Sequence, residues 1–444
     1  MSPDPRSQIP ATPIPSTIKD GFTFAAAGDQ IGPGRPVGPL KDPEIDKVAS
    51  ILRGADAAFA NNEGAIFDLE TFKGYPAAEN GGGDPVGVAA VAKDLREMGL
   101  RMVSKANNHA TDWGVEGLQE TERVLDAAGI VHAGSGRNRP AARAPAYLET
   151  PRGRIALVAT ASTFTPMSMA GLAEGEAPGR PGISVLRTRR IILATAEEMA
   201  AARTLAGPGH GSGRGRGATD TAQVNVAGQT YRLADKPGVT YEMNAYDLYE
   251  ILKSIRGAKQ TSDLTVFSIH AHESGPGGER DPADFLPTLF HYAVDAGADI
   301  VVEHGPHVLR GIEIYKGKPI FYGLGSLFFH MEQDRAPTRD TFESLNLDPG
   351  PLTYYEYLHS RFGFSPSYYE SVIAVSEFAE GRLKEMRLYP VDLRYALEPK
   401  KDLGVPRLAA PELGKKILEQ LRKDSERFGT DIRIENNVGI IRRP

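Results

Sequence analysis

The chain has 444 residues, of which 41% are hydrophobic and 24% charged, and its formal net charge is −6. This composition is typical of a globular protein, and the negative charge argues against a nucleic-acid partner, because nucleic-acid-binding proteins usually carry a basic face. No apolar run approaches the roughly 20 residues of a membrane helix, and the polar, Pro-rich residues 1–20 lack the apolar segment of a signal peptide. We therefore predict a cytoplasmic protein without a membrane segment, in which residues 1–20 form a flexible arm and residues 21–444 form a single α/β domain.

Short apolar runs alternate with amphipathic segments through the first part of the chain. The apolar runs predict strands at 23–27, 57–60, 101–104, 131–134 and 154–160. The amphipathic segments predict helices at 43–53, 85–98 and 115–128. This alternation is typical of a layered α/β fold.

The middle of the chain contains a glycine-rich segment, 206–217, which cannot bury apolar surface and is expected to be a flexible loop. We interpret about 186–237 as an insertion, with a helix at 189–205. The second half then predicts a helix at 246–255, strands at 264–269 and 299–302, a hairpin of strands 372–378 and 383–388, a helix at 411–427 and an edge strand within 431–441.

Several predicted strands end in residues that bind metals. The carboxyl ends of parallel strands line the crevice where α/β proteins bind ligands, so these side chains are expected to meet. Carboxylate, amide and imidazole groups suit Zn, Mn or Fe(II), and a thiolate site is excluded because the chain has no Cys. The residues at these strand ends are Asp29, Glu63, Asn108, His109, His270, His272, His304 and His307.

Other polar residues near these strand ends allow more than one interpretation. Asp112 is expected to cap the helix that follows it, with a catalytic base as the alternative, and Trp113 is expected to pack beneath the site loop. Arg180 and Arg310 are candidate anion clamps, because a guanidinium can hold a carboxylate or phosphate by two hydrogen bonds; the alternative is that each is an ordinary surface arginine. His270 and His272 lie two residues apart on an extended segment and face the same way, so the sequence leaves open which of them is the ligand.

Five motifs together resemble the CapA-type poly-γ-glutamate capsule synthesis proteins, which belong to the calcineurin-like metallophosphatase superfamily. They are GD at 28–29, NNE at 61–63, NNHATDWG at 107–114, IHAHE at 269–273 and HGPHVLRGIEIYKGKPIFYGLGS at 304–326. The resemblance covers about residues 22–393. It implies a four-layer α/β/β/α fold with two packed mixed sheets and a metal site at the strand ends.

The resemblance also assigns roles to individual residues. It implies that Asp29 is the first metal aspartate and part of the catalytic centre, that Glu63 is the acid able to bridge two metals, and that Asn108 is the metal-binding amide. His109 matches the catalytic histidine, and His270 or His272 matches the histidine of the fourth motif. The last metal pair of the family corresponds to His304 and His307.

This chain departs from the family pattern at two motifs. The usual Asp-x-His of the first motif is replaced, because Gln30 and Ile31 follow Asp29, and the second-motif acid is Glu63 where the family has Asp. One metal position thereby loses a ligand, so the number of ions, one or two, stays open.

The function that this resemblance implies is that of a metal-dependent hydrolase. It would use one or two divalent ions, Zn or Mn, and a metal-activated water to cleave a phosphoester, amide or ester bond in an anionic small-molecule or polyglutamate-like substrate. The alternative is a non-catalytic capsule biosynthesis subunit that binds the polymer or its synthetase. Fold alone does not decide between them.

Overall fold

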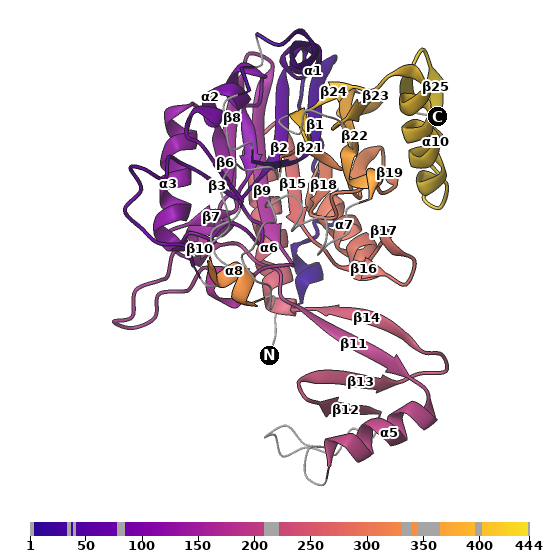
Figure 1. The fold of residues 1–444 in the computed structure, drawn as a ribbon. Helices are drawn as coiled ribbons and strands as arrows, with labels where there is room; N and C mark the ends of the chain where they lie inside the picture. Colours follow the sequence, from indigo (N-terminus) through magenta and orange to yellow (C-terminus); the bar gives the residue numbers. More distant parts are fainter. Residues whose placement is uncertain are drawn as a thin grey trace.

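The computed structural model describes residues 4–32, 37–38, 41–77, 85–207, 222–330, 339–344, 365–395 and 402–442. Within these ranges, two large β-sheets pack face to face and helices cover their outer sides (Figure 1). Residues 208–217 of the predicted glycine-rich loop lie outside the described residues. No helix in the described part of the chain is both long and apolar enough to cross a membrane.

The first sheet has ten strands and mixes parallel with antiparallel pairs. Its parallel half is β1, β2, β5 and β6, and β21 also pairs in parallel with β1. The antiparallel half contains β22, β23, β26, β25 and β24. The bounds are β1 Phe22–Ile31, β2 Ala57–Glu63, β5 Met102–Ser104, β6 Val131–Ala133, β21 Ser326–Phe329, β22 Glu370–Ala379, β23 Arg382–Asp392, β24 Arg407–Leu408, β25 Arg433–Glu435 and β26 Val438–Arg442.

The second sheet has six strands in the order β19-β20-β18-β15-β9-β8. Its four central strands are parallel, and an antiparallel strand closes each edge. The bounds are β8 Ala146–Thr150, β9 Gly153–Ala161, β15 Leu264–His270, β18 Ile300–His304, β19 Ile312–Tyr315 and β20 Lys318–Phe321. Both sheets are therefore mixed, as the resemblance implies.

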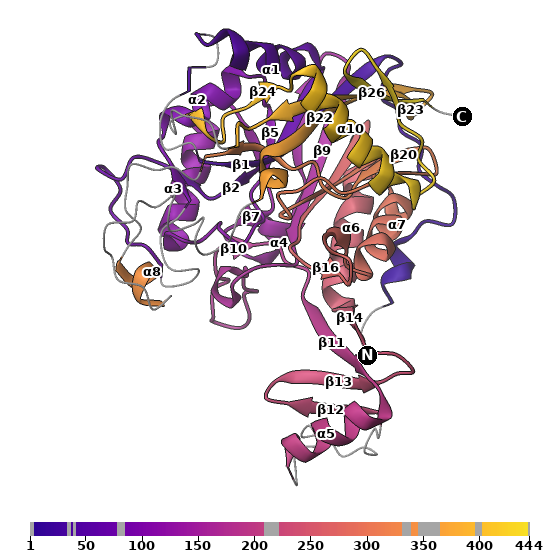
Figure 2. The same ribbon diagram turned by 45° about the vertical axis from the view of Figure 1, so that its right-hand side comes forward.

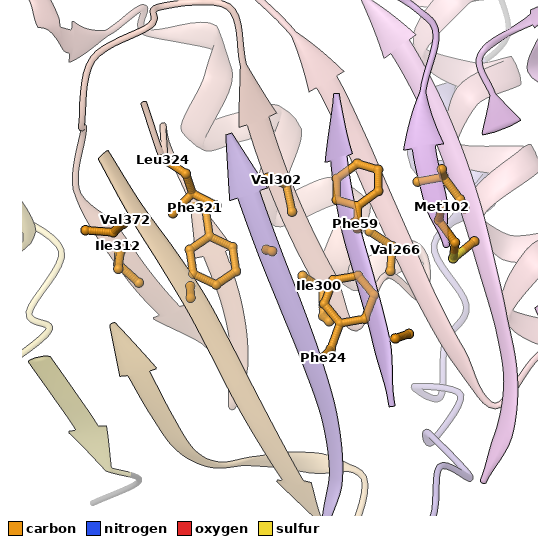
Figure 3. Packing of buried hydrophobic residues seen from close by; sticks show 14 of the residues in the cluster. Phe24, Phe59, Met102, Val266, Ile300, Val302, Ile312, Phe321, Leu324 and Val372 are labelled. Atoms are coloured by element: carbon orange, nitrogen blue, oxygen red, sulfur yellow. The ribbon is translucent and has the colours of Figure 1, made fainter. Parts of the chain in front are cut away.

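The main hydrophobic core fills the space between the two sheets. Phe24 and Phe59 of the first sheet point into this layer, as do Val266 and Ile300 of the second, and all four side chains are almost completely buried (Figure 3). The apolar residues of β1 alternate, so that Phe22, Phe24 and Ala26 face this core while Ala25 and Ala27 face the helices outside. A strand buried on both faces has this near-continuous apolar sequence.

Helices cover the outer face of each sheet. Helices α1 (Pro43–Gly54), α2 (Ala90–Glu97) and α3 (Gly114–Ala127) pack on the ten-stranded sheet, and α6 (Ala245–Gln260) and α7 (Phe285–Ala296) pack on the six-stranded sheet. The four-layer α/β/β/α arrangement is thereby confirmed. The predicted helix 85–98 is shorter than expected, because Val86–Gly87 forms strand β4 against β3 (Ala65–Ile66) and the helix begins only at Ala90.

The inserted segment forms a small unit of its own, below the two sheets in Figure 2. Its sheet has the order β12-β13-β11-β14, with α5 (Ala196–Ala206) packed on it. The prediction of one helix over 189–205 is wrong in its first half, since apolar, β-branched residues there pair with neighbouring strands and a capping box at Thr195 starts α5 only afterwards. We call this unit, residues 188–243, the insert module; its strands are β11 Thr188–Ala194, β12 Gln223–Val226, β13 Gln229–Leu233 and β14 Gly238–Met243.

The first and last described segments of the chain both contact the body. The predicted hairpin is confirmed as β22 and β23, with Glu380 and Gly381 both at positive φ in its turn. Helix α10 (Pro411–Glu426) and the β25–β26 edge hairpin follow, as the sequence predicts in outline. The N-terminal arm contains a short 3-10 helix, Pro5–Gln8, and Thr17 Oγ1 donates a 2.5 Å hydrogen bond to Asp263.

Gly28 allows β1 and the turn before β21 to approach closely. A Cβ added at Gly28 would lie 2.0 Å from the carbonyl oxygen of Gly325, a backbone atom that cannot rotate away. We expect Gly28→Ala to reduce the free energy of unfolding by about 1–3 kcal/mol or more, measured by urea denaturation. Gly54→Ala is the matched control, because no atom lies within 4 Å of its added Cβ, and it should leave stability unchanged or higher. Equal stability of the two variants would contradict this reading of the strand contact.

Candidate metal centre

Side chains from both sheets meet at one shared edge, where the parallel strands end. Potential ligand atoms form two groups here, and within each group all the atoms lie within 4.8 Å of one another. One group comes from Asp29, Glu63 and His270, and the other from Glu63, His272 and His307. Glu63 belongs to both groups. The fold thus brings together residues that are up to 278 positions apart, the separation of Asp29 and His307.

The Glu63 carboxylate lies at the centre of this cluster. Its Oε1 is 3.7 Å from His270 Nε2, 3.7 Å from His307 Nε2 and 3.9 Å from His109 Nε2. On the other side, His307 Nδ1 lies 3.2 Å from Asp29 Oδ2, and His270 Nε2 lies 3.0 Å from His272 Nε2. At these distances the histidine nitrogens lie near Glu63 but do not form hydrogen bonds with its carboxylate.

The donor set fits a divalent metal ion. Both carboxylate oxygens of Glu63 are buried and accept no hydrogen bond from any residue that the structure describes, although such a group is normally paired. Burial and the contact with His272 lower the pKa of His270 well below its ordinary value, and burial lowers that of His272 to about 3. Both imidazoles are therefore neutral near pH 7, the form that binds metals.

The pKa values of the two acids of the cluster shift in opposite directions. Burial raises the pKa of Glu63, and the nearby charges of Asp29 and Asp112 raise it further. Burial acts in the same direction on Asp29, but its close contact with His307 and the other neighbouring histidines lower its pKa overall. A cation placed between these carboxylates would relieve the repulsion that raises the pKa of Glu63.

Asp29 is held in place by two contacts. The register between β1 and β2 shifts between Ala26 and Asp29, and such a bulge changes the direction of a side chain. Asn61 Nδ2 donates to Asp29 Oδ1 at 2.8 Å, and the backbone N–H of Gly305 donates to Oδ2 at 3.0 Å. Asn61, which also lies 3.2 Å from His270 Nδ1, is a site residue that we did not predict, although its NNE motif already pointed to the neighbouring Glu63.

Asp112 binds His109 and does not cap helix α3. Its Oδ2 lies 2.5 Å from His109 Nδ1, whereas the helix begins at Gly114 with Trp113 in the cap position and no side-chain cap. The prediction of a helix cap is therefore wrong, because the turn directs this carboxylate back to the histidine three residues earlier. Trp113 packs edge-on against Phe67 and Phe72 at 5.6 Å, as expected of a packing residue.

The turn that carries His109 is fixed by Asn107. Its side-chain nitrogen donates to the backbone oxygen of Asn62 at 2.8 Å, and its oxygen accepts from the His109 N–H at 3.2 Å. Asn108 is half-buried on the same turn. Its role as a metal ligand stays a prediction.

His304 does not join the metal-facing groups. Its Nε2 lies 3.1 Å from the backbone oxygen of Ala27 and its Nδ1 lies 3.3 Å from the Ser268 hydroxyl. The ring packs edge-on against Phe59 at 5.5 Å in the core between the sheets. The predicted ligand role of His304 is therefore corrected, since neither of the two groups of potential ligand atoms among the described residues includes it.

Neither arginine reaches the site as an anion clamp. Arg180 is exposed, and its guanidinium donates to the backbone oxygen of Met169. Arg310 is fully buried: it donates to Glu303 at 2.5 Å, to two backbone oxygens and to the Ser274 hydroxyl. Both predictions are corrected, because these guanidiniums bind the protein itself.

His307 adopts a backbone conformation that is rare for its residue type. Its φ is +55°, in the left-handed region, and such strain occurs preferentially at functional sites. Its ring lies between His272, at 5.3 Å, and an aromatic wall of Phe329 at 5.5 Å and Tyr368 at 6.5 Å. The strained turn and the aromatic wall together hold the imidazole against Asp29 and Glu63.

The chain resembles several known proteins. It is 42% identical over 447 residues to the uncharacterized protein y4sH of Sinorhizobium fredii, covering 96% of this chain and 94% of that protein. It is 26% identical over 297 residues to the capsule biosynthesis protein CapA of Bacillus anthracis, covering 66% of this chain and 55% of that one. A crystal structure of a novel phosphatase from Mycoplasma pneumoniae superposes with a TM-score of 0.39 at 11% identity over 84% of this chain and 94% of that chain, a likeness too low to bear on fold or chemistry.

A family model agrees with these relatives. Residues 25–331 match the family described as bacterial capsule synthesis protein PGA_cap, and this range contains every residue of the cluster around Glu63. The strand ends, their ligand-type residues and this match lead to one conclusion. The chain belongs to the bacterial capsule synthesis protein family PGA_cap.

Proposed function

We propose that this protein is a metal-dependent hydrolase whose centre is the cluster around Glu63. The observation that carries the proposal is the buried Glu63 carboxylate. Neither of its oxygens accepts a hydrogen bond from the described residues, and Oε1 lies 3.7 Å from Nε2 of His270 and 3.7 Å from Nε2 of His307. Asp29, His270, His272 and His307 would complete the ligand set. Because Glu63 belongs to both groups, these residues would hold one ion or two.

The chemistry of such a site divides between the ion and the protein. A bound divalent ion supplies a Lewis acid that polarises a substrate oxygen and lowers the pKa of water. His109 is suited to move a proton, because its side chain is 24% exposed and its Nε2 faces the cluster. Asp112 accepts from Nδ1, which fixes the ring orientation and stabilises the protonated form that donates to a leaving group.

The proposed substrate is an anionic molecule with a phosphoester, amide or ester bond. The name of the Bacillus relative refers to capsule biosynthesis, and the motif resemblance is to poly-γ-glutamate proteins. A polyglutamate-like chain is therefore the first substrate to test. The alternative function, binding such a polymer or its synthetase without cleavage, predicts polymer binding with no turnover.

Metal binding can be tested by thermal unfolding. We expect Zn²⁺ or Mn²⁺ to raise the melting temperature of protein stripped with a chelator, because an ion that binds only the folded state stabilises it by about 2.7 kcal/mol at 100 times its Kd. Mg²⁺, which prefers oxygen ligands, is the control and should have a smaller effect. An unchanged melting temperature with Zn²⁺, Mn²⁺, Fe²⁺, Co²⁺ and Ni²⁺ would contradict the proposed centre.

Hydrolysis is tested separately on phosphate esters, γ-glutamyl amides and esters with the metal-loaded protein. Turnover of one class above the metal-free control would identify the bond. Metal binding without turnover of any class, together with binding of poly-γ-glutamate, would favour the non-catalytic alternative.

A further inference from the structure

The carboxylate of Glu273 lies next to the cluster around Glu63 but points away from it, toward Ser162, Thr163 and Thr188. Glu273 directly follows His272 at the end of β15, and its side chain turns toward the loop after β9. Its Oε2 accepts hydrogen bonds from Ser162 Oγ at 2.8 Å and from Thr163 Oγ1 at 2.9 Å. Its Oε1 accepts from Thr188 Oγ1 at 3.3 Å.

The Thr163 hydroxyl connects the Glu273 carboxylate to the backbone of His272. Thr163 Oγ1 accepts a 2.9 Å hydrogen bond from the backbone N–H of His272 while its own proton goes to Glu273. A hydroxyl that donates to a carboxylate becomes a better acceptor, so the two bonds strengthen each other. The backbone of His272 is thereby fixed from one side by a Glu273–Thr163 relay.

The same carboxylate reaches the base of the insert module. Thr188 is the first residue of β11, the strand through which the module leaves the body of the protein (Figure 2). On the opposite side, Arg310 donates to the backbone oxygen of Glu273 at 3.4 Å and to Ser274 Oγ at 3.1 Å. Glu273 therefore joins three parts of the chain: the end of β15, the loop after β9 and the base of the insert module.

We propose that Glu273 is a positioning residue that, through Thr163, holds His272 in the orientation required for metal binding. The inference rests on the proposed metal centre. Groups that orient a metal ligand change metal affinity by about 10–100-fold when they are removed, although they never touch the ion. Thr188 contributes less, since its contact with Glu273 is the longest of the three.

The experiment compares Glu273→Gln and Thr163→Val with the unaltered protein by calorimetric titration of Zn²⁺. We expect each variant to bind Zn²⁺ about 10–100-fold more weakly. The double variant should lose little more than either single variant, because both break one relay and residues of one network are not additive. Thr188→Val should weaken binding less than Thr163→Val. Glu149→Gln, which alters an exposed carboxylate paired with Arg154, is the matched control and should bind as the unaltered protein does.

A second measurement needs no metal. The exchange rate of the His272 amide hydrogen should rise in Glu273→Gln and Thr163→Val but not in Glu149→Gln, because Thr163 Oγ1 is the acceptor of that hydrogen. If Glu273→Gln does not fold, Thr163→Val still breaks the relay and serves alone in both measurements.

The outcomes separate this inference from the proposed function. Zn²⁺ binding by the unaltered protein with unchanged affinity in both variants would overturn the role of Glu273 and leave the metal centre intact. Additive losses in the double variant would overturn the relay, since they would show independent effects. If the unaltered protein bound none of Zn²⁺, Mn²⁺, Fe²⁺, Co²⁺ and Ni²⁺, the proposed centre would be overturned and, with it, this inference.

Discussion

His307→Ala is expected to lose metal and turnover together, whereas His109→Ala keeps its metal and loses turnover by about 10²–10⁴-fold. The difference follows from position. His307 lies 3.2 Å from Asp29 and 3.7 Å from Glu63, with its ring held by Phe329 and His272. His109 binds Asp112 through Nδ1, and its Nε2 lies at the edge of the cluster, 3.9 Å from Glu63 Oε1.

The measurements for this pair are metal content by elemental analysis and turnover on the substrate class identified for the unaltered protein. His291→Ala is the matched control, because His291 stacks on Tyr315 at 3.9 Å and bonds Glu313, outside the cluster. Loss of metal in His109→Ala equal to that in His307→Ala would show that His109 is a ligand. Normal metal content in His307→Ala would remove His307 from the ligand set.

Arg310→Met is expected to lower the free energy of unfolding by about 3–5 kcal/mol, the largest effect on stability that we predict. Arg310 and Glu303 are both fully buried and lie 2.5 Å apart, so removal of the cation leaves an acid in the core. Burial already raises the pKa of Glu303 to about 8 beside Arg310. Without the arginine the carboxylate would become still harder to ionise, and the backbone oxygens of Glu279 and Glu273 would lose a donor.

Urea denaturation of three proteins tests this prediction. Arg154→Met removes an exposed partner of Glu149 and should change stability by less than about 1 kcal/mol. The double variant Arg310→Met with Glu303→Leu should regain much of the lost stability, because a buried pair can be replaced by apolar residues at little cost. A stability loss in Arg310→Met no larger than in Arg154→Met would contradict the structural role of the buried pair.

The sequence by itself determined the layered α/β class and most of the strand ends. Apolar runs bounded by Gly and polar residues have a local cause, so strands such as 264–269 and 299–302 were predicted within a residue or two of β15 and β18. The Glu380–Gly381 turn was also predicted, since Gly readily adopts the positive φ that both residues of this turn have. Metal-type side chains at five strand ends predicted one site because such ends share an edge of a sheet.

Only the tertiary structure decided which of these side chains meet. His304 and His307 are three residues apart, yet the turn at Gly305 directs one ring into the core, against Phe59, and the other toward Glu63. The sequence does not contain this choice, because it depends on a left-handed backbone at His307 that surrounding contacts stabilise.

The same limit applies to charged groups whose partners are distant in the chain. Arg310 and Arg180 were both candidates to bind an anion. Arg310 instead donates hydrogen bonds to the Glu303 carboxylate and the Glu273 backbone oxygen, and Arg180 donates to the Met169 backbone oxygen. Asp112 binds Nδ1 of His109 because the chain turns between these two residues. The type of a side chain determines which kinds of group it can bind. Its actual partner depends on tertiary packing, because packing determines which polar groups are buried next to each other and must then pair.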